Sequence, residues 1–176
     1  NLVEKMGGTI TLESEYGVGT TFVIRVPFKI DLDADKREEQ KDISEKSIKG
    51  LHILLAEDNE LNMEIAEFLL QNEGADVTKA WNGQEAVELF RKSGPGGFDV
   101  ILMDIMMPVM NGYEATKMIR SLDREDAKEI PIIAMTANAF TEDRIRAKEA
   151  GMDEHVAKPV DVELLIKVIH KLVKYN

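Results

Sequence analysis

The sequence predicts an α/β fold: a doubly wound sheet of five parallel strands covered by five helices, preceded by a short β-hairpin and a charged linker. One alternating pattern supports the main part of this prediction. From Gly50 onward, short apolar runs alternate with longer segments in which apolar residues recur at helical spacing. Strands that alternate with helices in this way are typical of a parallel sheet with helices on both faces.

Five segments have the composition of short strands. The first, at positions 52–56, is a continuous apolar run, and the third, at positions 98–103, is expected to be another buried strand. Runs without polar interruption are typical of strands that are buried on both faces. The remaining strands are expected at positions 76–80, at 131–135 and up to 156–157.

Five helices are expected between and after these strands. The first contains apolar residues at helical spacing and ends near Gly74, because glycine often terminates helices. Its apolar positions are Leu61, Ile65, Phe68 and Leu69. The other helices are expected at positions 82–92, 113–121, 141–150 and 161–175. Right-handed crossovers between parallel strands then restrict the topology.

Polar residues follow the predicted strands, at the edge where doubly wound sheets bind ligands. Glu57 and Asp58 follow the first strand, and Asp104 follows the third. Thr136 follows the fourth strand and Lys158 the fifth. We therefore expect three carboxylates, a hydroxyl and an ammonium group to converge at one edge of the sheet.

This combination of groups suits Mg²⁺-dependent phosphoryl chemistry. Neighbouring carboxylates repel one another unless a cation is present, and Mg²⁺ is typically bound by one or two carboxylates with water and phosphate. An aspartate can act as the nucleophile and form an acyl phosphate. Thr136 could then donate its hydroxyl to the phosphoryl group, and Lys158 could pair with it. Any one of these residues alone would indicate only a cap, a turn or a surface charge.

Four segments resemble the signature motifs of response-regulator receiver domains, in the order and at the spacing of that family. They lie at positions 54–59, 100–112, 131–137 and 155–159. The resemblance implies a flavodoxin-like fold with Asp104 as the phosphoacceptor. It also implies Asp58 and Asp104 as Mg²⁺ ligands, Glu57 assisting through water, and the backbone carbonyl of Met106 as a further ligand.

The resemblance assigns roles to the remaining edge residues as well. It makes Thr136 the switch hydroxyl and Lys158 the partner of the phosphoryl group. Pro159 matches a family proline that often follows a cis peptide bond. Receivers usually have tyrosine or phenylalanine at the switch position where this chain has His155, which is aromatic in shape but polar.

The first 28 residues alternate in β fashion around a glycine turn, which predicts a helix end followed by a β-hairpin. They resemble the end of the ATPase domain of a histidine kinase, and Gly17, Gly19 and Thr20 match its last glycine box. The family's asparagine-bearing and aspartate-bearing nucleotide motifs do not occur in this sequence. We therefore expect this chain not to bind ATP in that manner.

Residues 29–50 are dominated by charged side chains and predict a solvated linker. The expected order is a kinase fragment at 1–28, the linker at 29–50 and a receiver domain at 51–176. This order resembles the C-terminal part of a hybrid histidine kinase, cut within its ATPase domain.

Composition limits the possible partners. The formal net charge of −11 argues against binding of nucleic acid, which depends on lysine and arginine. The absence of cysteine excludes disulfides, cysteine-bound metals and thiol nucleophiles. No apolar run approaches the ~18–20 residues of a membrane span. We expect no membrane contact by this chain and a cytoplasmic location, with any membrane anchor of the parent kinase lying upstream.

The resemblance implies a phosphorelay function. Asp104 would accept a phosphoryl group from phosphohistidine of the kinase and either pass it to a histidine phosphotransfer domain or switch conformation. The chain would then catalyse only its own phosphorylation and dephosphorylation. One alternative is a vestigial interaction module, which only His155 favours. A second is a metal-dependent phosphohydrolase, but such enzymes usually have an acid two residues after the nucleophile, where this chain has Met106.

Overall fold

The computed structural model describes residues 2–5, 7–27, 47–136 and 141–173. The chain divides into two compact units, Asn1–Asp42 and Ile43–Asn176. Residues 29–46, most of the predicted linker, lie outside the described residues.

The first unit contains the predicted β-hairpin. A short helix, α1 (Leu2–Lys5), precedes the strands β1 (Thr9–Glu15) and β2 (Gly19–Arg25), which pair antiparallel. Their register places Ile10 opposite Ile24 and Leu12 opposite Phe22. Since alternate residues of a strand point to the same side, these four apolar side chains share one face of the hairpin. All four are exposed in the described part of the chain.

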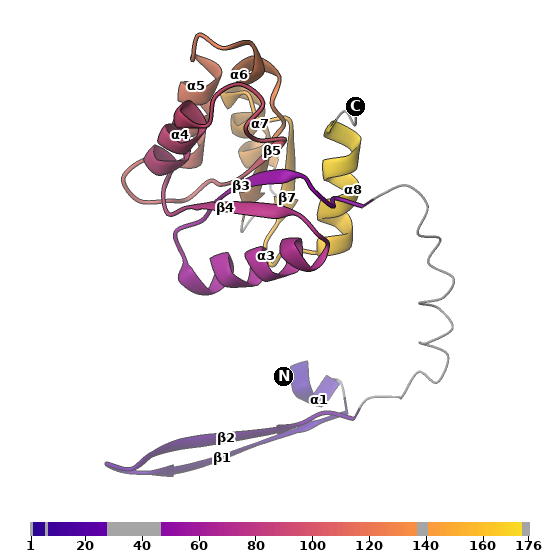
Figure 1. Cartoon of the computed structure of the whole chain (residues 1–176). Helices are drawn as coiled ribbons and strands as arrows, with labels where there is room; N and C mark the ends of the chain where they lie inside the picture. The colour runs from indigo at the N-terminus through magenta and orange to yellow at the C-terminus, as the bar shows by residue number, and fades with distance from the viewer. Residues whose placement is uncertain (1, 6, 28–46, 137–140, 174–176) are drawn as a thin grey trace. The chain divides into compact units, whose positions relative to one another are not determined.

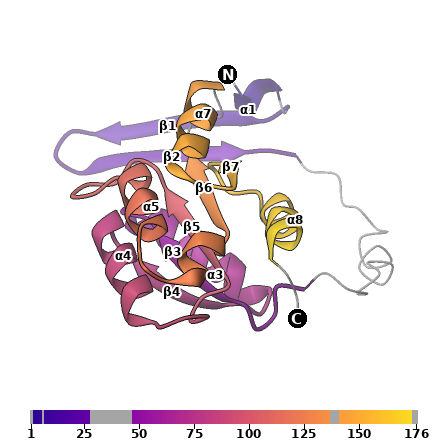
Figure 2. The same cartoon turned by 90° about the horizontal axis from the view of Figure 1, so that it is seen from above.

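The second unit is built around a parallel sheet with the strand order β4-β3-β5-β6-β7 (Figures 1 and 2). The strands are β3 (His52–Ala56), β4 (Asp76–Ala80), β5 (Val100–Asp104), β6 (Ile132–Thr136) and β7 (Glu154–Ala157). The strand that comes first in this unit lies beside the second and the third. The chain direction along the sheet therefore reverses at β3, and this order confirms the predicted doubly wound topology.

Helices cover both faces of the sheet (Figure 1). The five predicted helices are present, as α3 (Glu60–Asn72), α4 (Gly83–Lys92), α5 (Gly112–Arg120), α7 (Thr141–Ala150) and α8 (Val162–Leu172). The structure adds a short helix, α6 (Glu125–Glu129), which the sequence analysis did not predict. Within the described segments, no helix is long and apolar enough to cross a membrane.

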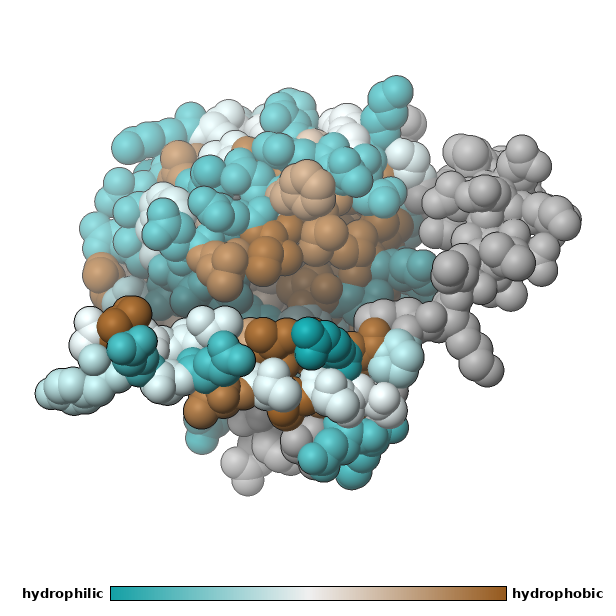
Figure 3. Space-filling model, turned by 90° about the horizontal axis from the view of Figure 1, so that it is seen from below, coloured by the Kyte–Doolittle hydropathy of each residue, from teal (hydrophilic) through white to brown (hydrophobic). Residues whose placement is uncertain are grey.

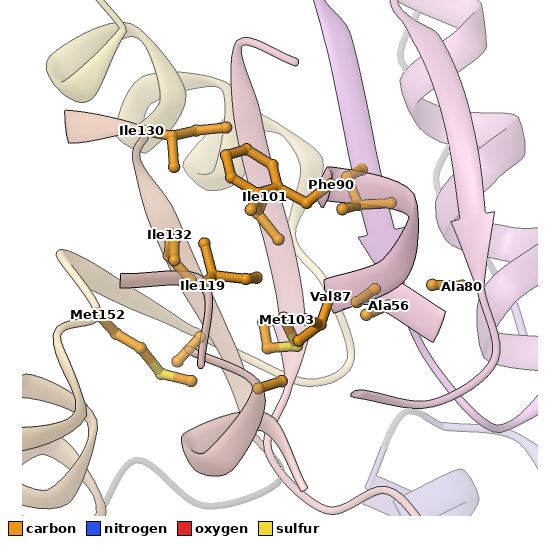
Figure 4. Close-up of a cluster of buried hydrophobic side chains, with 14 of the residues drawn as sticks. Ala56, Ala80, Val87, Phe90, Ile101, Met103, Ile119, Ile130, Ile132 and Met152 are labelled. Carbon is orange, nitrogen blue, oxygen red and sulfur yellow. The ribbon is translucent and has the colours of Figure 1, made fainter. Parts of the chain in front are cut away.

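Two hydrophobic clusters fill the space between the sheet and its helices. Leu54 and Ile101 point to the cluster under α4, α5 and α7, where Phe90 and Ile119 are fully buried (Figure 4). The neighbouring residues in the strands point to the opposite cluster, under α3 and α8. Burial on both faces explains why β3 from Ile53 to Ala56 and β5 from Val100 to Met103 contain only apolar residues.

Asparagine and aspartate side chains set the starts of four helices. Asn59, Asn82, Asn111 and Asp161 each accept a hydrogen bond from the backbone N–H three residues later. These caps satisfy donors that a helix start would otherwise leave unpaired. Asn59, Asn82 and Asp161 each lie within four residues of a strand end, so these three caps also fix the turn that leads from the sheet into the helix.

The last residues of the predicted linker pack with the second unit. Ile48 has no exposed surface and belongs to the cluster under α3 and α8. The N–H of Gly50 donates to the carbonyl oxygen of Gly74 at 2.8 Å. The chain therefore enters this unit along the space between α3 and α8, several residues before β3.

Candidate functional site

The carboxyl ends of neighbouring strands bring the predicted site residues to one edge of the sheet. Glu57 and Asp58 follow β3, Asp104 ends β5, Thr136 ends β6 and Lys158 follows β7. Glu57, Asp104 and Thr136 are buried, whereas Asp58 is exposed. The cluster can therefore be reached from solvent on the side of Asp58.

The three carboxylates lie close enough to share one cation. Glu57, Asp58 and Asp104 each offer an oxygen atom, and these atoms all lie within 4.8 Å of one another. Carboxylates at this spacing repel each other, and two of the three are withdrawn from water. An all-oxygen ligand set of this kind fits a hard divalent cation such as Mg²⁺.

Lys158 joins two of the carboxylates. Its Nζ atom lies 2.5 Å from Oε2 of Glu57 and 2.7 Å from Oδ2 of Asp104. The peptide bond between Lys158 and Pro159 is cis, as the sequence predicted, and the Lys158 N–H donates to the Thr136 carbonyl oxygen at 2.8 Å. The loop after β7 is thus held to the end of β6, and the ammonium group of Lys158 reaches into the acidic cluster.

Burial and the neighbouring charges shift the pKa values of Asp104 and Lys158. Burial raises the pKa of Asp104, and the hydrogen bond and charge of Lys158 offset the rise only in part. Burial alone would lower the pKa of Lys158, but its hydrogen bonds to Asp104 and Glu57 and their charges raise it on balance. The pKa of Asp104 therefore rises mainly through burial, and the pKa of Lys158 rises because two carboxylates stabilise one ammonium group.

The turn after β5 places the backbone of Met106 beside the cluster. The Met106 N–H donates to Oδ1 of Asp104 at 3.2 Å. Its side chain is exposed and makes no part of the hydrophobic core. The residue that the resemblance assigns as a carbonyl ligand therefore lies next to Asp104.

The position of Asp104 depends on Gly112, the first residue of α5. A Cβ atom at Gly112 would overlap with the carbonyl oxygen of Asp104, and the Gly112 N–H donates to Ile105 O at 3.0 Å. Between these residues the chain makes a tight turn, in which the Met110 N–H donates to Pro108 O at 2.7 Å. The loop is thereby folded closely against the end of β5.

The two predicted switch residues occupy different surroundings. Thr136 ends β6, one residue beyond the partner of Asp104 in the sheet register. His155 lies on β7 opposite Ala134, and its Nδ1 atom is 3.4 Å from Oε1 of Glu154. His155 therefore contacts Glu154, its neighbour in β7.

Asn62 contacts the cluster, although the sequence analysis did not single it out. Its Nδ2 atom donates to Oε1 of Glu57 at 3.0 Å, and the Asn59 N–H donates to the same oxygen at 3.4 Å. The only signal in the sequence was an amide side chain one turn into the helix that follows Glu57. Without the course of the chain after β3, that position is indistinguishable from a solvated helix face.

Comparison with known proteins adds to this description. The response regulator receiver domain family matches residues 53–170. The aerobic respiration control sensor protein ArcB of Escherichia coli K12 is 34% identical over 171 residues, which make up 97% of this chain and 21% of ArcB. The chain spans 7% to 21% of the length of the curated relatives that it matches.

Two solved receiver domains are similar in structure. The receiver domain of the Pseudomonas aeruginosa sensor histidine kinase PA1611, with a magnesium ion in its active site cleft, is 37% identical with a TM-score of 0.61. The match covers 70% of this chain and 97% of that chain. The receiver domain of Saccharomyces cerevisiae Ssk1, co-crystallised with the histidine phosphotransfer protein Ypd1, is 31% identical with a TM-score of 0.63. It matches 71% of this chain and 90% of that chain.

Proposed function

The chain belongs to the response regulator receiver domain family, and from this premise we propose that Asp104 accepts a phosphoryl group from phosphohistidine in a Mg²⁺-dependent reaction. The main support is the contact of Lys158 with Asp104 at 2.7 Å, beside two further carboxylates. The Asp104 nucleophile, the Lys158 ammonium group and a set of metal-binding oxygen atoms are then within reach of one phosphoryl group.

Each residue has a distinct role in the proposed transfer. An oxygen of Asp104 attacks phosphorus while the phosphorus–nitrogen bond of the donor breaks and the imidazole leaves with the bonding electrons. Lys158 pairs with the phosphoryl oxygens, and Thr136 donates its hydroxyl to them. Since the geometry is positioned in advance, most of the catalysis is electrostatic.

We assign Mg²⁺ to the oxygen cluster. Asp58, Asp104 and the Met106 carbonyl would hold it, with Glu57 assisting through water. When bound, Mg²⁺ neutralises charge on the carboxylates and on the transferring group. The Mg²⁺ ion in the cleft of the PA1611 receiver supports this assignment.

We further propose that phosphorylation is read out through Thr136 and His155. Movement of the Thr136 hydroxyl toward the phosphoryl group would change the packing around β7, where His155 is half-buried. Its polar imidazole, beside Glu154, distinguishes this readout from one that uses a tyrosine or phenylalanine.

A protein carrying a histidine phosphotransfer site is the proposed partner, and the complex of Ssk1 with Ypd1 supports this class. Leu61, Ile65 and Phe68 on α3 have 64%, 49% and 65% exposure and lie at helical spacing on one side of the helix. Figure 3 shows hydrophobic residues gathered on the side of the unit that carries α3. We propose this apolar face, beside the acidic cluster, as the place where the donor or acceptor helix binds.

We also infer the context of the receiver. Residues 1–28 would be the end of a histidine-kinase ATPase domain, 29–50 the linker and 51–176 the receiver of a hybrid histidine kinase. The alignment with ArcB over 97% of the chain supports this order. The parent protein would be the kinase, and the part described by this sequence would catalyse only its own phosphorylation and dephosphorylation in the cytoplasm.

The test is phosphorylation by acetyl phosphate with Mg²⁺, followed by intact-mass spectrometry of the wild-type chain and Asp104→Asn. We expect the wild-type chain to gain the mass of one phosphoryl group and the variant to gain none. Chelation of Mg²⁺ should prevent the gain. A wild-type chain that is folded but unmodified would contradict the proposal and favour a phosphorylation-independent interaction module.

A further inference from the structure

We propose that Asn62 is a positioning residue for Mg²⁺ binding, because its side-chain amide holds the Glu57 carboxylate in the orientation that the metal site needs. The proposal rests on the proposed function of the acidic cluster. It adds a residue outside the carboxylates and Lys158, located on the first turn of α3.

The two oxygens of the Glu57 carboxylate have separate partners. Oε1 accepts the Asn62 amide at 3.0 Å and the Asn59 N–H at 3.4 Å, whereas Oε2 accepts the Lys158 ammonium at 2.5 Å. Glu57 is only 2% exposed, so water can contribute little to holding it. The orientation of the carboxylate is therefore set by Asn62 and Asn59 on one side and by Lys158 on the other.

The contact between the Lys158 ammonium group and Oε2 of Glu57 does not persist through the proposed reaction. The same ammonium contacts Asp104 at 2.7 Å, and in the proposed reaction it pairs with the phosphoryl group on Asp104. As the ammonium shifts toward that group, Oε2 of Glu57 becomes available to the metal or to its bound water. Asn62 then remains as the side chain that restrains Glu57 through Oε1.

A neutral donor is the side-chain type that suits this position. A lysine would add positive charge beside the cluster and oppose cation binding, and an aspartate would repel Glu57 and could not donate to it. An amide donates a hydrogen bond without changing the charge of the site. Groups that orient metal ligands in this way commonly affect metal affinity by about 10-fold or more.

The helix start does not depend on the Asn62 side chain. It is the backbone N–H of Asn62 that donates to Oδ1 of the capping residue Asn59, at 3.0 Å. Replacing Asn62 by alanine therefore retains the cap and introduces a better helix former. This separates the effect on Glu57 from an effect on folding.

The experiment compares Asn62→Ala with Asn72→Ala, the same substitution at an exposed position at the far end of α3. Titration of MgCl₂ into each 176-residue chain by calorimetry gives the dissociation constant. The rate of phosphorylation by acetyl phosphate is then measured across Mg²⁺ concentrations. We expect Asn62→Ala to bind Mg²⁺ about 10-fold more weakly and to regain the wild-type rate at saturating Mg²⁺, while Asn72→Ala matches wild type.

Equal Mg²⁺ dissociation constants for the two variants would overturn the role of Asn62, as would a reduced rate that saturating Mg²⁺ does not restore. Asn62→Gln, which keeps an amide donor, should recover part of the affinity. It provides the comparison if Asn62→Ala melts at a lower temperature without metal. A wild-type chain without Asp104-dependent phosphorylation would instead overturn the proposed function, so the two failures are distinguishable.

Discussion

The Nζ atom of Lys158 lies 2.7 Å from Oδ2 of Asp104, a carboxyl group whose pKa is raised by burial. The same atom contacts Glu57 at 2.5 Å. One positive charge therefore stabilises two buried carboxylates in the absence of metal. This arrangement makes the stability of the unit sensitive to its cation, to pH and to any change at Asp104.

Replacement of Lys158 by methionine should destabilise the metal-free chain. Two buried carboxylates would lose their compensating charge, and we expect a loss of about 2 kcal/mol at neutral pH in urea unfolding. The loss should shrink when Mg²⁺ is added, since the metal neutralises the same carboxylates. It should also shrink in acid, where Asp104 is protonated.

Lys171→Met is the matched control for this experiment. Lys171 also contacts a carboxylate, Oε2 of Glu154 at 3.0 Å, but its side chain is 68% exposed. Exposed pairs contribute about 0–1 kcal/mol. Equal losses for the two variants, or a loss for Lys158→Met that Mg²⁺ leaves unchanged, would mean that Lys158 does not neutralise the cluster.

Asp104→Asn should melt at a higher temperature than wild type when no metal is present. Burial raises the pKa of Asp104, so the folded state favours its protonated form. The stability associated with that form is present below the pKa of an unfolded aspartate and is lost as pH rises through the raised value. Asparagine should therefore add stability at neutral pH and little in acid, as measured by calorimetry across pH.

With Mg²⁺ present, the wild-type chain should melt at a higher temperature than Asp104→Asn. The metal binds the folded wild-type cluster and raises its melting temperature by mass action, and the variant should lose most of that increase. Asp123→Asn serves as the control, because it removes one negative charge at an exposed position. If both variants gained equal stability, the effect would come from net charge rather than from the cluster.

Gly112→Ala should reduce both stability and phosphorylation. The added Cβ atom overlaps with the backbone carbonyl of Asp104, so the end of β5 or the start of α5 must move. We expect a loss of about 2 kcal/mol in urea unfolding and slower phosphorylation by acetyl phosphate. Gly94→Ala is the comparison, since that glycine has positive φ but open space around it. It should lose about 1 kcal/mol and keep its phosphorylation rate.

The central strands β3, β5 and β6 could be predicted from the sequence, because burial on both faces requires a local apolar run. β3 and β4 occur at the predicted positions, and β5 ends one residue later than predicted, at Asp104. The polar residues that end these runs were therefore identifiable as edge residues. Convergence at one edge followed from the parallel topology, which the alternation of strands and helices indicated.

The side-chain contacts at the carboxyl ends of the strands were not predictable from local sequence patterns. Lys158 and Glu57 are 101 positions apart, and their pairing depends on how the loop after β7 lies beside β3. The short helix α6 is a similar case. Arg124, which precedes it, donates to the carbonyl oxygen of Phe90 at 2.6 Å and lies over the Phe90 ring. These distant contacts leave no periodic signal in residues 125–129.

Val109→Asn should stabilise the chain. Val109 has a φ of 67°, the only positive φ at a residue other than glycine among the described residues, and it is the central residue of the tight turn closed by Met110 and Pro108. A β-branched side chain is strained in this conformation, whereas asparagine tolerates it. We expect a gain of about 1 kcal/mol in urea unfolding. Val109→Thr, which keeps the branching, should show no gain, and equal behaviour of the two variants would remove strain as the explanation.

Leu61→Ala and Phe68→Ala should separate the proposed partner surface from the chemistry of Asp104. Both side chains are largely exposed on α3, so their loss should cost little stability and leave phosphorylation by acetyl phosphate unchanged. Transfer from a phosphorylated histidine phosphotransfer domain should slow by about tenfold, because apolar anchors contribute strongly to such interfaces. Leu164→Ala removes an exposed leucine from α8 and should transfer at the wild-type rate. A parallel fall with both donors would place the defect in the acidic cluster, and no fall with the protein donor would exclude α3 as its binding face.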